Sequence, residues 1–210
     1  MKDAVRKAFV SFTAPLEGVV EHLYLDVIGL VTIGIGNLVD PITVALELPL
    51  VHANGTPATL DEIATEWRTV KSHTELKIDG HRAAKKWCKL HLTPDGIEQV
   101  VSRKLDQMVA HLRERFPEWD EWPCDAQLAV LSMSWACGPA FRFATLDAAC
   151  KAQDWMKASQ SCHINTTGNP GIAPRNALNI ELFQNASWVA DRGLDRDTLV
   201  WAPPLPPEAA

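Results

Sequence analysis

The longest regular pattern of apolar residues begins directly after Thr93-Pro94-Asp95. A threonine that can cap a helix, a proline at the first helical position and an acid in the first turn together mark a helix start. Helical spacing then continues for about six turns, as far as Pro117. The residues that keep this spacing are Ile97, Val100, Val101, Leu105, Met108, Val109, Leu112 and Phe116. The pattern predicts one long helix over residues 93–116.

Similar spacing predicts shorter helices before and after the long one. Residues 2–12 have apolar side chains on one side, and Thr13 can cap a second helix that begins there. Residues 125–137 are apolar nearly all round, which is typical of a helix buried on every side. Further helices are predicted over residues 146–152, 154–162 and 173–189.

The pattern changes from helical to strand-like within residues 16–37. Apolar residues at three- and four-residue steps reach Leu23, and residues 24–35 are rich in β-branched residues and glycine. We therefore expect a short helix that runs directly into a β-hairpin, with Glu17 early in the helix.

Residues 40–92 have weaker patterns. Asn54-Gly55 is typical of a two-residue type I′ turn, which predicts a second hairpin or a β-extension of the small lobe. Thr59 and Glu62 have the spacing of a capping box, so a helix begins at Leu60. Residues 81–91 have the pattern of one amphipathic helix.

These elements predict an α+β fold that is mostly helical, with a small antiparallel β-hairpin lobe and a long inter-lobe helix. A chain of 210 residues with 47% hydrophobic content can bury a sizeable core. We expect a single domain with four consecutive parts: a small lobe over 13–92, a connecting helix over 93–116, a helical lobe over 117–200 and a proline-rich tail over 201–210.

Two acids in the helix-hairpin stretch suggest acid–base chemistry. Glu17 has apolar neighbours, and Asp26 follows the first strand beside the turn. Glycoside hydrolysis needs such a pair, one carboxyl kept protonated by an apolar site and one kept ionised in a wetter site. Thr32, on the return strand, has a hydroxyl that can hold a water.

Together with Tyr24, Gly29 and the run Thr32-Ile33-Gly34-Ile35-Gly36-Asn37, this string resembles the catalytic segment of phage-type lysozymes. These are the T4-like muramidases and endolysins of glycoside hydrolase family 24. The resemblance implies a lysozyme-like fold, with Glu17 as general acid and Asp26 and Thr32 orienting the attacking water. It also implies supporting or substrate-binding roles for Tyr24, Gly36, Asn37 and Arg175, although Asn37 stands where the family usually has His.

The resemblance implies a muramidase that hydrolyses the β-1,4 bond between N-acetylmuramic acid and N-acetylglucosamine in bacterial peptidoglycan and so lyses the cell wall. The alternatives are a non-catalytic peptidoglycan-binding or spike subunit, and a lytic transglycosylase. The sequence does not distinguish an endolysin from a secretion-system effector, and it leaves a holin, an immunity protein or a delivery component open as partners.

Charge and composition narrow the partners and the location. A net charge of −6 argues against a nucleic-acid partner. No targeting segment or membrane span is evident, so we expect a monomer in the host or producer cytoplasm until release, acting then in the periplasm or cell wall. Five cysteines without paired spacing are typical of reduced thiols, with a disulfide after export as the alternative.

Two other groups of residues are interpreted as structural. His81, Cys88 and His91 lack a fourth ligand at zinc spacing, so we predict no metal and no cofactor. The aromatic residues Phe116, Trp119 and Trp122 could stack on sugar rings, but packing at a helix end is the favoured interpretation.

Overall fold

The computed structural model of the chain describes residues 1–203, and the proline-rich residues 204–210 of the expected tail lie outside this range. The protein is mostly helical with small antiparallel sheets, which confirms the α+β class in general terms. The chain forms two compact units. Unit 2 is Glu17–Lys104, and unit 1 combines Met1–Leu16 with the chain from Leu105 onward.

Unit 2 contains two small antiparallel sheets. The first has the order β1-β2-β3 and is built from β1 (Val20–Leu25), β2 (Val31–Gly34) and β3 (Asn37–Leu38). In it, Tyr24 pairs with Thr32. The second sheet pairs β4 (Leu50–His52) with β5 (Leu90–Leu92). The hairpin predicted within residues 24–35 is therefore present, but its first strand begins earlier, inside the segment predicted to be helical.

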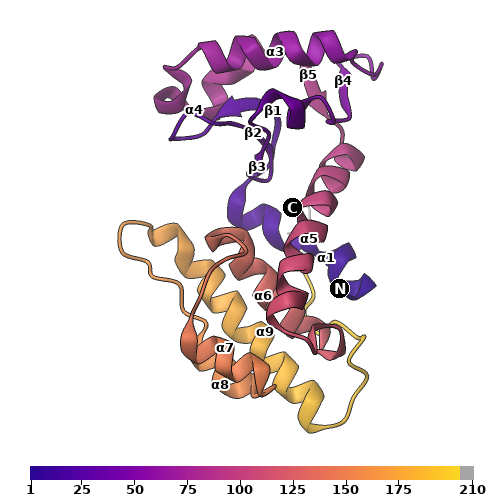
Figure 1. Cartoon of the computed structure of the whole chain (residues 1–210), viewed down its shortest axis with the longest axis vertical. Helices are drawn as coiled ribbons and strands as arrows, with labels where there is room; N and C mark the ends of the chain where they lie inside the picture. The colour runs from indigo at the N-terminus through magenta and orange to yellow at the C-terminus, as the bar shows by residue number, and fades with distance from the viewer. Residues whose placement is uncertain (204–210) are drawn as a thin grey trace, which may run out of the picture. The chain divides into compact units, whose positions relative to one another are not determined.

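Two helices of unit 2, α3 (Leu60–Ser72) and α4 (Leu76–Ala84), contact the hairpin strand β1. The short helix α2 (Ile42–Ala45) contacts α3, and the 3-10 turn η1 (Lys85–Trp87) follows α4. Both α3 and α4 pack on β1, and Figure 1 shows them beside the β1–β2 hairpin. The predicted capping box is confirmed, because the Thr59 hydroxyl accepts from the Glu62 amide and Glu62 accepts from the Thr59 amide.

The β-extension predicted within residues 40–92 is present, because β4 pairs with β5, but the predicted turn type and the helix over residues 81–91 are wrong. A type I′ turn needs positive φ at both central residues, and only Gly55 has it, although Val51 bridges Pro57 across this turn. The helix predicted over residues 81–91 ends at η1, because β5 finds its hydrogen-bond partners on β4. His91 consequently lies on a strand.

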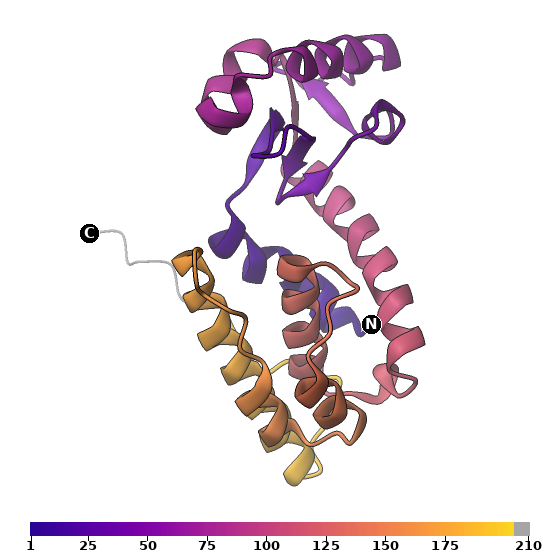
Figure 2. The ribbon, with the colours of Figure 1, turned by 60° about the vertical axis from the view of Figure 1, so that its left-hand side comes forward.

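Unit 1 is helical. It contains α1 (Asp3–Glu17) through Leu16, the end of α5 (Pro94–Arg115), α6 (Cys124–Cys137), α7 (Ala144–Lys151), α8 (Trp155–Ser161), α9 (Ala173–Asp191) and the 3-10 turns η2 (Trp119–Glu121) and η3 (Pro170–Ile172). Nearly every residue of α6 is buried, as its apolar pattern predicts. Figure 2 shows α6 running beside α9, and the two helices pack directly.

The aromatic residues after α5 confirm the packing interpretation. Phe116, Trp119 and Trp122 are at most 1% exposed, and the two indole rings lie 5.1 Å apart. No sugar could reach rings that are covered in this way. Trp201 closes the same unit, since its ring meets Phe12 edge-on at 5.1 Å and its amide donates to the buried Asp125 carboxylate.

The long helix was predicted closely, but the first helices were not. α5 begins at Pro94, and the Thr93 hydroxyl accepts from the Gly96 amide at 3.1 Å. At the N-terminus, one continuous helix α1 replaces the two predicted helices, and Thr13 is fully buried in it. Pro15 lies in the last turn, where its missing N–H removes only one helical bond, so the helix continues to Glu17.

Candidate functional site

The first sequence-predicted acid, Glu17, is the last residue of α1 and is exposed. The next residue, Gly18, has φ +77°, a left-handed conformation that commonly ends helices and suits glycine. The expectation of a shielded acid early in a helix is therefore wrong.

The second acid, Asp26, organises the turn between β1 and β2. Its Oδ1 accepts hydrogen bonds from the amides of Ile28 at 3.0 Å and Leu30 at 2.9 Å. The Asp26 backbone closes the same turn with bonds to Gly29 and Leu30 of 2.9 Å each. Asp26 therefore has a structural role, because its carboxylate fixes the tight connection of the hairpin.

Tyr24 shows that both acids lie near one point of unit 2. Burial raises the pKa of the Tyr24 hydroxyl, and the negative charges of Asp26 and Glu17 raise that pKa further. Thr32, which pairs with Tyr24 across the sheet, is 5% exposed, and its hydroxyl donates to the Leu30 carbonyl oxygen at 3.3 Å. The hairpin thus brings the sequence-predicted acids into one electrostatic neighbourhood, but the Thr32 hydroxyl bonds to backbone.

Gly36 and Asn37 shape the turn after β2. Gly36 has φ +68°. The buried Asn37 side chain accepts from the Ile35 amide at 3.1 Å and donates to the Val100 carbonyl oxygen at 3.4 Å. These bonds tie the hairpin to the first half of α5, so Asn37 supports the fold of unit 2.

A further residue of this neighbourhood, Lys104, was missed by sequence reasoning. Its ammonium group donates to the Gly36 carbonyl oxygen at 3.1 Å, and burial lowers its pKa to about 8, opposed in part by the charge of Glu17. Lys104 follows Gly36 by 68 residues. No local sequence signal could have indicated this contact.

Arg175 belongs to unit 1. Its side chain is 1% exposed, and Nη1 donates to the Ser132 carbonyl and hydroxyl oxygens at 3.0 Å each. The sequence had matched Arg175 to a residue beside Glu17. The bonds to Ser132 hold Arg175 on the buried helix α6, and the match to a residue beside Glu17 stays a prediction.

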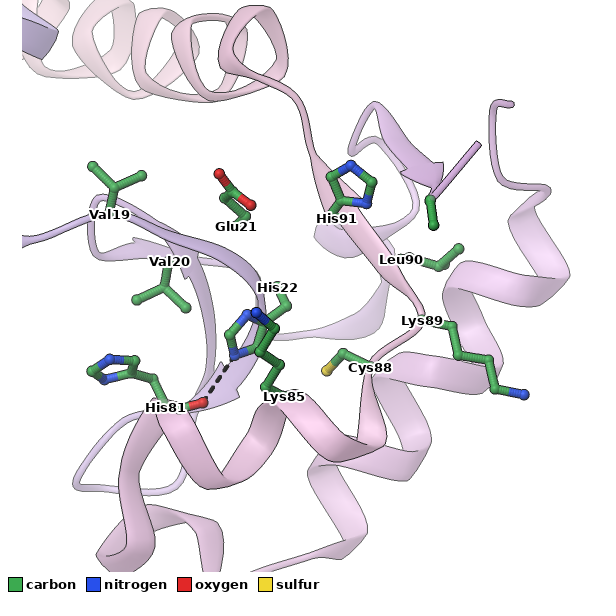
Figure 3. A pocket seen from close by; sticks show the side chains of 11 residues that line it. Val19, Val20, Glu21, His22, His81, Lys85, Cys88, Lys89, Leu90 and His91 are labelled. Atoms are coloured by element: carbon green, nitrogen blue, oxygen red, sulfur yellow. Dashed lines mark hydrogen bonds between the residues drawn. The ribbon is translucent and has the colours of Figure 1, made fainter. Parts of the chain in front are cut away.

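A concave site of unit 2 lies between β1 and the segment that leads into β5, and Figure 3 shows it from close by. This β1–β5 pocket has a volume of about 490 Å³, within the usual range for small-ligand sites. Two lysines, three histidines and a single acid line it, and three larger apolar side chains complete the wall. The lining residues are Val19, Val20, Glu21, His22, Ala53, His81, Lys85, Cys88, Lys89, Leu90 and His91.

His22 is the most constrained ionisable group of the β1–β5 pocket. Its Nε2 lies 2.9 Å from the His81 carbonyl oxygen, a contact drawn as a dashed line in Figure 3. A carbonyl oxygen only accepts, so Nε2 carries the hydrogen and Nδ1 has the lone pair. Burial lowers the pKa of His22, and the positive charge of Lys85 lowers it further. His22 is therefore neutral near pH 7 and able to accept a proton.

The inner wall of the pocket is fixed by a buried carboxyl. Glu66 on α3 is 7% exposed, and its Oε2 accepts from the amides of Lys89 at 2.6 Å and Leu90 at 3.1 Å. Burial raises the pKa of Glu66 and raises that of the neighbouring Cys88 thiol to about 12. Cys88 thus stays protonated, and Glu66 fixes the backbone of Lys89 and Leu90, which line the pocket.

The described residues contain no group of three or more histidine, cysteine or acidic side chains arranged to hold a metal ion. The five cysteines are free. Within residues 1–203, no helix combines the length and the apolar character that crossing a membrane requires.

Comparison with known proteins gives one family. Residues 48–138, less than half of the chain, match the family model described as isopentenyl transferase. No curated protein matches the chain. The matched segment includes the helices and β5 that form one side of the β1–β5 pocket, and it begins after the hairpin. The match therefore says nothing about Glu17, Asp26 or Thr32.

This match corrects the functional predictions from the sequence. The family found is isopentenyl transferase, and no lysozyme family matches, so the recognition of a phage-type lysozyme is overturned. The predicted muramidase activity and its two alternatives are overturned on the same finding, because a glycoside hydrolase and a prenyl transferase catalyse different reactions. The associated expectations, which were cell-wall lysis and action in the periplasm or cell wall, are corrected with them.

Proposed function

We propose that the chain is an isopentenyl transferase and that its donor, an allylic isopentenyl diphosphate, binds in the β1–β5 pocket. The observation that carries this proposal is the composition of that pocket. Lys85, Lys89 and His81 can face a diphosphate, and Val19, Val20 and Leu90 can face a five-carbon chain. The residues from Ala53 to His91 that line it lie inside the segment similar to isopentenyl transferases.

The pocket supplies two functions that this transfer needs. In the reaction, an acceptor N–H or O–H group forms a bond to C1 of the isopentenyl group, the C1–O bond breaks, and diphosphate leaves with the bonding electrons. Lys85 and Lys89 stabilise the negative charge on the departing diphosphate. Neutral His22 accepts the acceptor's proton at Nδ1, because its Nε2 hydrogen is already held by His81.

Phosphate binding in this proposal depends on side chains. The sequence has no glycine-rich loop of the form G-x-x-x-x-G-K-S/T, in which backbone amides surround the phosphates. Charge-assisted bonds from two exposed lysines contribute roughly 1.5–3 kcal/mol each at most, and less in contact with water. We therefore expect donor binding to be weak and to decrease with added salt.

The test is binding and turnover of a radiolabelled allylic isopentenyl diphosphate by the full chain. We expect saturable binding in equilibrium dialysis, weakened about tenfold or more by the double variant Lys85→Gln, Lys89→Gln. The matched control is Lys77→Gln, an exposed lysine of α4 outside the pocket lining, which should bind like wild type. The proposal would be contradicted if the double variant bound the donor as tightly as wild type. It would also be contradicted if the protein released reducing sugars from murein and left the diphosphate intact.

The sequence-predicted catalytic residues are retained as a separate proposal. We infer that Glu17, Asp26 and Thr32 form a proton-handling cluster with Tyr24, supported by the charges of both acids acting on the Tyr24 hydroxyl. Gly36, Asn37 and Arg175 are its proposed supporting residues. This cluster requires no isopentenyl donor. A test of the cluster is therefore independent of the test of the β1–β5 pocket.

We also propose that the chain is a single domain in which α5 joins the lobe of residues 13–92 to the lobe of residues 117–200. We further propose that the protein acts as a monomer and without nucleic acid. Peptidoglycan is no longer supported as a partner, because that prediction depended on the muramidase activity.

A further inference from the structure

A second concave site lies in unit 1, at the end of α5, and no part of the proposed function uses it. This α5-end hollow has a volume of about 240 Å³. It is lined by His111, Glu114, Arg115, Pro139, Ala140 and Arg142. Two guanidinium groups and one imidazole therefore surround it, against a single carboxylate.

Arg115 is held rigidly at this hollow. Its guanidinium lies 4.5 Å from the centre of the Phe141 ring and 4.8 Å from that of Phe116, and its side chain is 6% exposed. Nε donates to one oxygen of the partly exposed Asp147 carboxylate at 3.2 Å, and Nη2 donates to the other. One edge of the planar group is thus bound, and its orientation is fixed.

The other edge of the same guanidinium is incomplete. Nη1 of Arg115 is buried and has no hydrogen-bond partner in the part of the chain that the structure describes. A buried donor of a charged group without a partner is costly, and such groups commonly mark the place of a bound ion or water. The incomplete edge belongs to a residue that lines the hollow.

We propose that the α5-end hollow binds a phosphate-type oxyanion between Arg115 and Arg142. Two oxygens of a phosphate match the free edge of a guanidinium, and Arg142 is exposed and able to reach an anion from the solvent side. Asp147 already neutralises Arg115, Glu114 is nearby, and the end of α5 carries the negative end of its dipole. These three charges oppose the anion, so the affinity should be modest, with a dissociation constant on the order of 1 mM.

The experiment is a titration of the full chain with inorganic phosphate at constant ionic strength, followed by the side-chain ¹⁵N resonances of its arginines. We expect a saturable shift of the Arg115 resonances, with about tenfold weaker binding in Arg142→Gln and no saturable shift in Ala140→Asp, which places a carboxylate in the hollow. Arg192→Gln is the matched control, because Arg192 is an exposed arginine of the same unit that stacks on Trp188 at 5.1 Å. It should bind phosphate like wild type.

A second arm with glycerol phosphate distinguishes the sources of the oxyanion. Equal affinity for the ester shows that only the phosphoryl group is recognised, and tighter binding of the ester shows that an organic phosphate is the preferred ligand. Unsaturable shifts, or the same affinity in Arg142→Gln as in wild type, would overturn the site. The hollow lies in unit 1 and the donor pocket in unit 2. A failure to bind phosphate in the hollow therefore leaves the proposed donor site unaffected, and a failure to bind the donor leaves the phosphate site unaffected.

Discussion

Tyr24 offers a direct test of the hairpin cluster at the level of single residues, because it is the one tyrosine of the chain. A negative charge near a tyrosine disfavours the tyrosinate form and so raises the pKa of the hydroxyl. Burial acts in the same direction and is the larger effect, with Asp26 and then Glu17 contributing after it. The titration of Tyr24 therefore reports both acids at once.

We predict that Asp26→Asn and Glu17→Gln each lower the pKa of Tyr24, with the larger decrease in Asp26→Asn. The tyrosinate absorbance measured against pH gives this pKa directly, since the tryptophans do not titrate in that range. Glu21→Gln is the control, because Glu21 is exposed on the same strand and does not act on Tyr24. An unchanged titration in both acid variants would remove the support for a cluster.

The candidate residues Glu17, Asp26 and Thr32 were predicted from residue type and spacing alone. The same sequence pattern placed Glu17 early in a helix, whereas the structure has Glu17 at the exposed C-terminal end of α1. Asp26 proved to be bound to turn amides, a structural role that the same spacing allows. Spacing gives residue identity and rough order, but exposure depends on where the neighbouring elements begin and end.

At the scale of elements, the capping box of α3 is the clearest local device. Thr59 and Glu62 satisfy each other's amides, and α3 carries the buried Glu66 that positions Lys89 and Leu90. The start of α3 is therefore linked to the pocket wall through one helix.

We predict that Thr59→Ala lowers the free energy of unfolding by about 1 kcal/mol, because the Glu62 amide loses its side-chain acceptor. Thermal or denaturant unfolding measures this. Thr59→Ser keeps the hydroxyl and should lose only a few tenths of a kcal/mol. A Thr59→Ala protein as stable as wild type would show that the rest of α3 holds its first turn without the cap.

Elements with local signals were predicted well, and those that depend on distant partners were not. α3, α5 and α6 begin where capping residues or apolar periodicity place them. The segment 81–91 carries a helical pattern, and yet the chain from Lys85 onward forms a 3-10 turn and then a strand, because β4 offers hydrogen bonds that the local pattern does not encode. Tertiary pairing overrides a weak helical preference in this segment.

At the scale of the whole molecule, the question is how strongly the two units are coupled in folding. Leu128 on α6 is fully buried in unit 1, while Ile33 on β2 is fully buried in unit 2. If the chain is a single cooperative domain, as we propose, a core substitution in one unit must destabilise both.

We predict that Leu128→Ala lowers the free energy of unfolding by about 2–5 kcal/mol, through lost burial and the cavity that remains. Hydrogen exchange should report the same loss for the slowest amides of α6 in unit 1 and of α3 in unit 2. Leu60→Ala is a control for the substitution itself, because Leu60 is 62% exposed. Faster exchange in α6 with unchanged exchange in α3 would show that the units unfold separately.

Local signals along the chain were enough to predict the α+β class, the hairpin, the long helix and the buried helix, because helix caps, turn residues and apolar periodicity act over a few neighbouring positions. The tertiary structure decided which side chains meet. Lys104 reaches Gly36, Glu66 accepts from the amides of Lys89 and Leu90, and Asp147 binds one edge of the Arg115 guanidinium. Such contacts join residues tens of positions apart, and the burial and charge that give them their chemistry exist only after the chain has packed.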